Sequence, residues 1–252
     1  MGYIMRDSID CNKLNASNTF TYQPTQTYYT SPPGQSLLYR RRKINLIDNA
    51  YYANHNRQTF KHDNIFTINL ISSPGSGKTT LLTKLIKRLK SQHQLAVITA
   101  DQHTQLDTQR IKKTGIKAIQ INTQTSSHLQ AQMIKKAYQG LTIETNSFLF
   151  IENIGNLICP ANCDLGEALK IVVLSVTEGE DKPLKYPAIF KNADLLIINK
   201  IDLLPYVKFN IKICTQYVHQ INPDLKIMTL SATTGKHISQ FSQWLVEQKE
   251  KY

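Results

Sequence analysis

Residues 65–80 read IFTINLISSPGSGKTT, and this stretch decides the fold. Its first part, Ile65–Ile71, is a run of apolar and β-branched residues that favours a buried strand. Its second part holds Gly75 and Gly77 and then opens into apolar residues at helical spacing. A strand that turns through a glycine-rich loop into a helix directs backbone N–H groups at one point, where they can bind phosphate oxygens. We therefore predict a phosphate-binding loop.

The side chains of the loop match this prediction. Gly75 and Gly77 let the backbone wrap a phosphate without a side-chain clash. Lys78 would reach the β- and γ-phosphates of a nucleotide, and the Thr79 hydroxyl would ligate Mg²⁺. The usual pattern opens with glycine, whereas this chain has Ser72 at that position. The other loop residues expected at the nucleotide are Ser76 and Thr80.

Apolar runs alternate with amphipathic stretches from residue 65 onward. The runs predict strands at Ile65–Ser72, Leu95–Ala100, Ile116–Ile121, Ser147–Glu152, Lys170–Thr177, Leu195–Asn199 and Leu225–Leu230. Helical patterns between them are Thr79–Lys90, Leu129–Gln139, Lys208–Gln220 and Ile238–Lys249. We predict an α/β fold with a doubly wound, mostly parallel sheet and helices on both faces, and the phosphate loop makes this a P-loop NTPase.

Composition divides the chain into three expected parts. Residues 1–42 are mostly polar, without an apolar period, and we expect a disordered arm there. Residues 43–64 are compatible with an N-terminal helix, and residues 65–252 form the predicted P-loop domain. The formal net charge is +12, but the only dense basic run is Arg40–Lys43, so we expect no nucleic-acid partner.

Three classes of protein are unexpected. There is no run of about 18 apolar residues, so we expect no membrane span. The first residues lack a basic-then-apolar signal peptide. Four cysteines are too few for a disulfide scaffold in 252 residues. The expected location is therefore the cytoplasm.

The strand at 195–199 ends in Asn199-Lys200-Ile201-Asp202, which indicates guanine specificity. The Asp202 carboxylate can accept hydrogen bonds from guanine N1–H and the 2-amino group, and adenine offers neither donor there. Asn199 can bond the purine edge or brace the phosphate loop, and the Lys200 stem can lie along the ring. About 30 residues later, Ser231 and Ala232 follow a strand, where a backbone N–H can meet guanine O6.

Two strand ends between these elements predict the remaining nucleotide contacts. Asp101 can hold Mg²⁺ directly or through water. Glu152 can organise the Mg²⁺ shell and the attacking water, and the Gly155 N–H can sense the γ-phosphate. Lys78, Asp101 and Glu152 are therefore the candidate catalytic residues. No residue is a strong general base, which fits slow GTP hydrolysis by positioning and electrostatics.

Several longer segments resemble the HypB family, the GTPases that assist nickel insertion into [NiFe]-hydrogenase. The matching segments include residues 69–82, 115–123, 128–133, 151–160, 164–167, 173–187 and 199–205. The most specific is VLSVTEGEDKPLKYP at 173–187, which a shared phosphate loop alone cannot explain. The resemblance covers about residues 65–245.

The resemblance implies a SIMIBI-type G domain and a GTP-hydrolysing metallochaperone that uses GTP and Mg²⁺ and carries Ni²⁺ or Zn²⁺. It also implies a homodimer that forms with GTP, and two partners, the hydrogenase nickel-insertion protein and the hydrogenase large subunit. A Cys-His pair and a second Cys after the Glu-x-x-Gly motif would form the metal site at the dimer interface. Metal ligands beside a γ-phosphate sensor would couple the GTP state to metal affinity.

The sequence departs from the family where the metal would bind. Ser127 stands where the family has the first Cys, and a neutral hydroxyl is a poor ligand. His128 and Cys159 remain, and Cys163 follows Cys159 by four residues. One hypothesis is that Cys163 replaces the missing thiolate, so that His128, Cys159 and Cys163 surround the metal. The other is that metal binding is weakened or lost.

Two alternative functions remain open. A urease-type nickel chaperone GTPase shares the architecture, but its Cys-Pro-His motif is replaced by Cys159-Pro160-Ala161. A GTP-switched binding module with a degenerate metal site is the other. Such a module would dimerise with GTP and never take up nickel.

Overall fold

The computed structural model describes residues 19–21 and 37–252, apart from residues 102–103 and 124–125. The arm predicted at residues 1–42 therefore lies mostly outside the described residues. Two segments within that range are described, a three-residue strand at Thr19–Thr21 and the start of a helix at Leu37.

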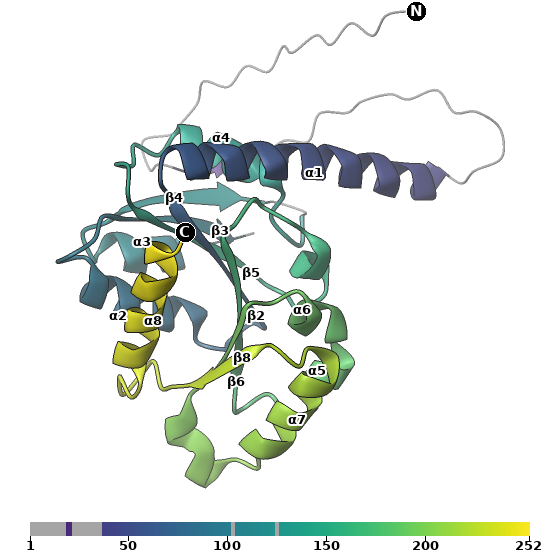
Figure 1. The fold of residues 1–252 in the computed structure, drawn as a ribbon, viewed down its shortest axis with the longest axis vertical. Coiled ribbons are helices and arrows are strands. Elements are labelled where there is room, and N and C mark those ends of the chain that lie inside the picture. Colours follow the sequence, from purple (N-terminus) through teal and green to yellow (C-terminus); the bar gives the residue numbers. More distant parts are fainter. Residues whose placement is uncertain (1–18, 22–36, 102–103, 124–125) are drawn as a thin grey trace, which may run out of the picture.

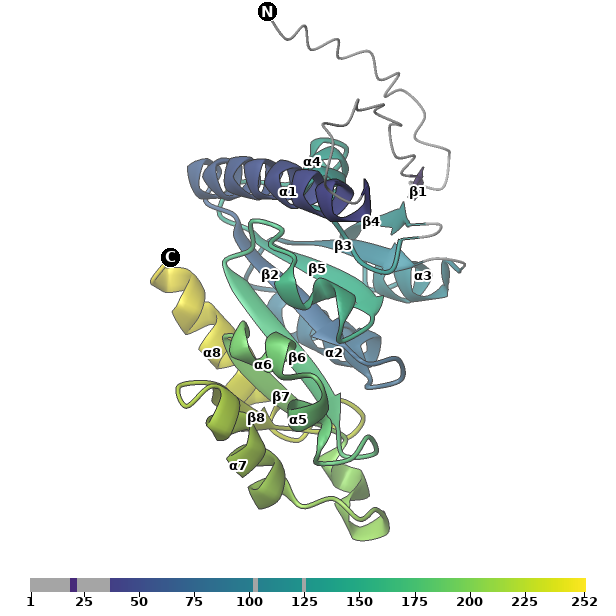
Figure 2. The same cartoon turned by 90° about the vertical axis from the view of Figure 1, so that its right-hand side faces the viewer.

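The described residues form one eight-stranded sheet in which every neighbouring pair is parallel (Figures 1 and 2). The strand order is β1-β4-β3-β5-β2-β6-β7-β8. The strands are β1 (Thr19–Thr21), β2 (Phe66–Ser72), β3 (Leu95–Asp101), β4 (Lys117–Asn122), β5 (Phe148–Gly155), β6 (Leu169–Ser175), β7 (Leu195–Asn199) and β8 (Lys226–Thr229). The predicted α/β, doubly wound fold is confirmed, and all seven predicted strands are present within a few residues of their expected bounds.

Helices cover both faces of the sheet (Figure 1). They are α1 (Leu37–His62), α2 (Lys78–Leu89), α3 (Leu106–Lys112), α4 (Ala131–Gln139), α5 (Lys182–Lys185), α6 (Pro187–Lys191), α7 (Ile211–Ile221) and α8 (Ile238–Glu250), with 3₁₀ turns η1 (Cys159–Asn162) and η2 (Ile201–Tyr206). Successive residues of β2 face opposite sides: Leu70 packs with α2 and α8, and Ile71 packs with α6 and α7. Burial on both faces explains the continuous apolar runs.

Helix α1 is longer than the predicted helix at 43–64, since it begins at Leu37 and ends at His62. Residues 37–42 hold neither proline nor glycine, so nothing in their composition stops the helix from extending. Its buried residues Ala53, Asn56 and Phe60 lie against the rest of the chain. In Figures 1 and 2, α1 lies beside α4 across one end of the molecule.

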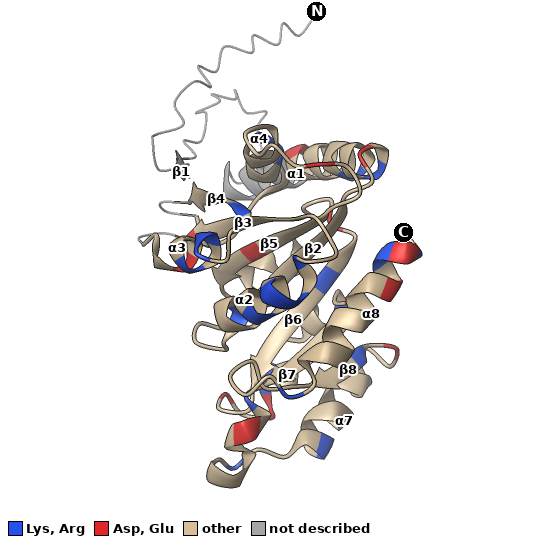
Figure 3. Cartoon of the chain, turned by 90° about the vertical axis from the view of Figure 1, so that its left-hand side faces the viewer, with Lys and Arg blue, Asp and Glu red and all other residues tan. Residues whose placement is uncertain are grey.

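Lys and Arg are distributed over several elements, including α2, α3 and α7, with acidic residues among them (Figure 3). Within the described residues no helix is both long enough and apolar enough to cross a lipid bilayer.

We expect Gly166→Ala to destabilise the chain more than Gly115→Ala. Both glycines have φ +87, where alanine costs about 1–2 kcal/mol. A Cβ at Gly166 would lie 2.6 Å from Ala53 O and 2.7 Å from Asn56 Cβ, both in α1, whereas at Gly115 it would meet no described atom within 4 Å. The close contact should add about 1–3 kcal/mol at Gly166 alone. Denaturant unfolding measures the difference, and equal losses would contradict the close approach of α1.

Candidate functional site

The carboxyl ends of the central strands meet at one edge of the sheet and surround a cavity of about 700 Å³. In an open parallel sheet this edge, where the chain order reverses, is where ligands bind. The lining includes the predicted loop residues 72–80 together with the strand-end residues Asp101, Glu152 and Gly155. The fold thus brings together side chains that are up to about 80 residues apart in the sequence.

The phosphate loop depends on two glycines with left-handed backbones. Gly75 has φ 75 and Gly77 has φ 92, and α2 begins directly after Gly77 at Lys78. A Cβ on Gly77 would lie 2.6 Å from Asn199 Nδ2, so both the backbone and the packing require glycine there. Gly155, at the end of β5, is constrained by packing alone, because its Cβ would lie 3.0 Å from Pro74 Cα.

Ser72 fits the place where glycine is usual. Its side chain is buried, and its Oγ donates to Ser73 O at 2.8 Å. The same oxygen accepts a hydrogen bond from Lys78 Nζ at 3.3 Å. The hydroxyl therefore supplies Lys78 with an acceptor in a buried position.

Lys78 and Glu152 are opposite charges buried in the cavity, with exposures of 8% and 4%. Burial lowers the pKa of Lys78 and raises the pKa of Glu152, and the opposite charge of each partner partly offsets both shifts. Thr79 Oγ1 donates to Glu152 Oε1 at 2.5 Å. Each charge thus helps to keep the other ionised in a site with little water.

The oxygen donors of the cavity fit a Mg²⁺ ion. Glu152 Oε2 is buried and has no hydrogen-bond partner among the described residues. The Asp101 carboxylate, at the end of β3, accepts from Thr104 N at 3.1 Å and from Thr104 Oγ1 at 3.0 Å. Carboxylate and hydroxyl oxygens are the hard ligands that Mg²⁺ prefers.

Asn199 braces the phosphate loop, which is one of the two roles that the sequence predicted for it. Its Nδ2 donates to Ser76 O at 2.9 Å, and its Oδ1 accepts from Lys200 N at 2.8 Å and from Ala232 N at 3.0 Å. Ser231 N also has a partner, Lys236 O at 3.1 Å. The N–H groups of Ser231 and Ala232, expected at guanine O6, are thus already engaged within the chain.

The contacts of Lys200 and Asp202 indicate where the part of a ligand beyond its phosphates would bind. Lys200 has a left-handed backbone, and its Nζ donates to Gly75 O at 2.6 Å. Asp202 Oδ1 is buried and has no hydrogen-bond partner in the part of the chain that the structure describes. The same holds for Ser76 Oγ in the loop. A buried carboxylate oxygen without a donor fits a ligand that brings its own N–H groups.

The candidate metal ligands lie on two neighbouring segments. Asn156 Nδ2 donates to Ser127 O at 3.4 Å, so the segment before α4 lies beside the segment that follows β5. His128 is partly buried, which lowers its pKa, and its Nδ1 has no hydrogen-bond partner within the described ranges. Cys159, the first residue of η1, is partly exposed.

The structure does not bring Cys163 together with His128 and Cys159. Cys163 is buried in an apolar cluster, its Sγ donates to Leu129 O at 3.1 Å, and burial raises its pKa to about 12. Among the described residues no three His, Cys, Asp or Glu side chains form a group that could hold a metal. The apolar packing around the Cys163 thiol therefore gives no support to the hypothesis that Cys163 joins His128 and Cys159 around the metal.

Sequence reasoning missed Asp107 and Arg110, which line the nucleotide cavity from α3. Their charges, shortly after Asp101, are the signal that could have found them. It also missed Asn153 of β5, whose Oδ1 accepts from Ile154 N at 2.9 Å and from Leu129 N at 3.4 Å. Asn153 thus joins the strand beside the phosphate loop to the His128 segment.

Comparisons with known proteins agree with this geometry. Residues 66–229 match the family model described as CobW/HypB/UreG, nucleotide-binding domain. The chain is 49% identical over 201 residues to hydrogenase maturation factor HypB of Azotobacter chroococcum, which covers 80% of this chain and 66% of that protein. It is 48% identical over 225 residues to HypB of Escherichia coli strain K12, covering 87% of this chain and 77% of that protein.

A solved structure is similar throughout the domain. The crystal structure of HypB from Helicobacter pylori in complex with nickel has a TM-score of 0.78 and 36% sequence identity. The match covers 81% of this chain and 96% of that one.

Proposed function

Because the chain belongs to the CobW/HypB/UreG nucleotide-binding family and, within it, to the HypB hydrogenase maturation factors, we propose that it hydrolyses GTP to drive nickel delivery to [NiFe]-hydrogenase. The products are GDP and phosphate. The partners are the hydrogenase nickel-insertion protein and the hydrogenase large subunit.

One arrangement carries the GTPase proposal: the buried charges of Lys78 and Glu152 lie beside a phosphate loop that Asn199 braces, and Asp202 Oδ1, three residues after Asn199, is buried without a described hydrogen-bond partner. The loop N–H groups and Lys78 would bind the β- and γ-phosphates. Asp202 would accept from the two guanine donors that adenine lacks. Positioning and charge, rather than a strong base, then account for the reaction, so turnover is slow.

The remaining residues of the site would serve the metal ion and the base. Thr79 and Asp101 would hold Mg²⁺, whose charge neutralises phosphate oxygens when it is bound. Glu152 would organise the water near it, and Gly155 would meet the γ-phosphate. Lys200, whose Nζ already reaches Gly75 O, would lay its stem along the guanine ring.

For the cargo, we propose that His128 and Cys159 are the ligands that one chain contributes. A closed tetrahedral metal site has four protein ligands, and one chain would supply only two. A dimer with two-fold symmetry would supply all four. Imidazole and thiolate suit both Ni²⁺ and Zn²⁺. The homodimer would form with GTP.

We expect Cys159→Ala to weaken nickel binding by more than about tenfold and Cys163→Ala to leave it within about twofold of the wild type. The reason is that the Cys163 thiol is buried, with its pKa raised to about 12, and donates to Leu129 O. Competition titration with Ni²⁺ and Zn²⁺ measures both variants. A large loss in Cys163→Ala alone would restore the three-ligand hypothesis.

The same titration, with and without a non-hydrolysable GTP analogue and with the oligomeric state followed by sizing, tests the whole proposal. The proposal requires a dimer with the analogue and nickel affinity that depends on it. A GTP-dependent dimer that never takes up nickel would instead favour the binding module, which the replacement of a ligand by Ser127 keeps as the second candidate.

A further inference from the structure

The two segments that carry His128 and Cys159 are both held by the same helix, α1. The contacts come from Asn49 and Asn56, which are seven residues, or about two helical turns, apart and therefore lie on one face of α1. Each of these two side chains bonds both segments at once. Helix α1 lies outside residues 66–229, which match the family model.

Asn49 joins the two segments through the two ends of its amide. Its Oδ1 accepts from Ala131 N at 2.8 Å, and its Nδ2 donates to Asp164 O at 2.8 Å. Ala131 is the first residue of α4, three residues after His128, and the N-cap residue Gln130 makes no side-chain cap bond. Asn49 therefore supplies, from another helix, the acceptor that the start of α4 needs.

Asn56 repeats the arrangement from a buried position, with 2% of its surface exposed. Its Nδ2 donates to Ala131 O at 2.8 Å and to Leu165 O at 2.9 Å. Both N–H groups of this amide are thus used, one on each segment. An alanine at this position would leave the two carbonyls without these donors in a site from which water is excluded.

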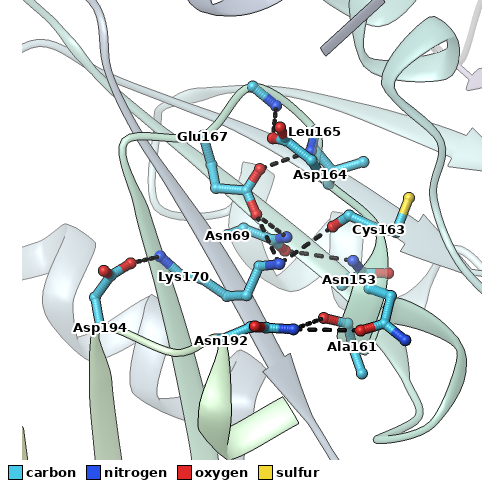
Figure 4. A network of polar contacts seen from close by, with 12 residues as sticks. Asn69, Asn153, Ala161, Cys163, Asp164, Leu165, Glu167, Lys170, Asn192 and Asp194 are labelled. Atoms are coloured by element: carbon cyan, nitrogen blue, oxygen red, sulfur yellow. Dashed lines mark hydrogen bonds and ion pairs between the residues drawn. The ribbon is translucent and has the colours of Figure 1, made fainter. Parts of the chain in front are cut away.

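The segment at 163–167 has further contacts, one of them from Arg57 of α1 itself and the others from the sheet. Arg57 Nη2 donates to both carboxylate oxygens of Asp164 at 2.8 Å. In Figure 4, Glu167 accepts from Asn69 Nδ2 at 3.1 Å and from Leu165 N at 2.7 Å, and Lys170 Nζ donates to Cys163 O at 3.3 Å. The segment is therefore anchored to β2 and β6, and α1 relates it to the start of α4.

We propose that Asn49 and Asn56 are positioning residues that set the separation between the His128 segment and the Cys159 segment, and that α1 thereby determines nickel affinity. This rests on the proposed metal role of His128 and Cys159. The described residues that line the nucleotide cavity include none from α1. Loss of these amides should therefore change metal affinity and leave nucleotide affinity unchanged.

The test uses the full chain with Asn49→Ala and Asn56→Ala, and with Asn54→Ala as the control, since Asn54 is an exposed asparagine on the same helix. We expect Ni²⁺ affinity to fall at least about tenfold in the first two variants. Affinity for a fluorescent GTP analogue should stay within about twofold in all three. The proposal would be overturned if both Asn49→Ala and Asn56→Ala bind nickel with wild-type affinity. Equal loss of nickel and nucleotide affinity would overturn it as well.

A second variant separates bridging from helix capping and keeps the test open if Asn56→Ala fails to fold. Asn49→Asp retains the acceptor for Ala131 N and loses the donor to Asp164 O. It should weaken nickel binding while amide exchange at Ala131 stays slow. Full nickel affinity in Asn49→Asp would show that Asn49 only caps α4.

Amide hydrogen exchange separates failure of this inference from failure of the proposed function. If the wild type takes up no nickel, the proposed metal role of His128 and Cys159 is wrong. Amide exchange then tests by itself whether Asn49 bridges the two segments. Asn49→Ala should then speed exchange at Ala131 and also in residues 163–166, because one side chain holds both. Faster exchange at Ala131 alone would show that Asn49 does not bridge the two segments.

Discussion

Replacing Lys78 with alanine is expected to slow GTP hydrolysis by at least about a thousandfold. Lys78 is 8% exposed as a residue and lines the phosphate cavity, where its ammonium group donates to Ser72 Oγ. In a buried site a fixed positive charge stabilises the transferred phosphate far more than water would. Alanine removes that charge and leaves a space that cannot neutralise the phosphate oxygens.

The Lys78→Ala chain should remain folded, which makes the loss interpretable. The charge left behind is Glu152, whose pKa burial already raises and which the Lys78 charge now lowers. Without Lys78 the pKa of Glu152 rises further, so the carboxyl group can become neutral by taking up a proton rather than remain as an unpaired charge.

Phosphate release under single-turnover conditions measures the rate, and circular dichroism checks the fold. Lys84→Ala is the matched control, because Lys84 is on the same helix and exposed. Hydrolysis at the wild-type rate in Lys78→Ala would refute the assignment of the phosphate loop.

Replacing Asp202 with asparagine is expected to weaken GTP binding by at least about a hundredfold and to favour xanthosine triphosphate. Guanine presents two N–H donors at its N1 and 2-amino positions, and a carboxylate accepts both. An asparagine amide accepts one and opposes the other with its own N–H. Xanthine has N1–H and a carbonyl at position 2, which pairs with that N–H.

The prediction follows from the unpartnered Asp202 Oδ1, which is buried and has no described donor. Competition binding with GTP, XTP and ATP measures it, with Asp224→Asn as the control at an exposed aspartate before β8. If Asp202→Asn binds GTP as the wild type does, the assignment of Asp202 to guanine recognition is wrong, even if the phosphate loop is assigned correctly.

Much of the fold was predictable because its strands are buried on both faces. Runs such as Leu195–Asn199 are apolar at every position but the last, so their type could be read without knowing their neighbours. Short elements were not predictable in this way. Helices α3, α5 and α6 and the three-residue strand β1 are too short for their periodicity to stand out. The start of α1 was missed for a related reason, since residues 37–42 are helix-compatible without an apolar stripe.

The candidate nucleotide site followed from local signals, and the structure sharpened the roles. Lys78 and Thr79 of the phosphate loop and Asp101 and Glu152 at two strand ends all line the cavity. The brace from Asn199 to Ser76 O and Ala232 N was one of two options in the sequence, and only the placement of β7 beside the loop decides it. The Ser72 hydroxyl has a use, as an acceptor for Lys78, that no pattern could assign.

The sequence by itself determined that this chain has a phosphate loop on a parallel α/β sheet, because that loop is a continuous segment whose chemistry needs only its own residues and the strand and helix at its ends. The cysteines are different. Cys159 and Cys163 are four residues apart and look equivalent in sequence, yet one is partly exposed and the other donates to Leu129 O. Only tertiary packing separates them, because burial depends on α1 and α4, which are distant in the chain and meet at residues 163–166. The free energy of that packing depends on helices and strands from distant parts of the chain. The four-residue spacing of the two cysteines therefore does not determine which of them is buried.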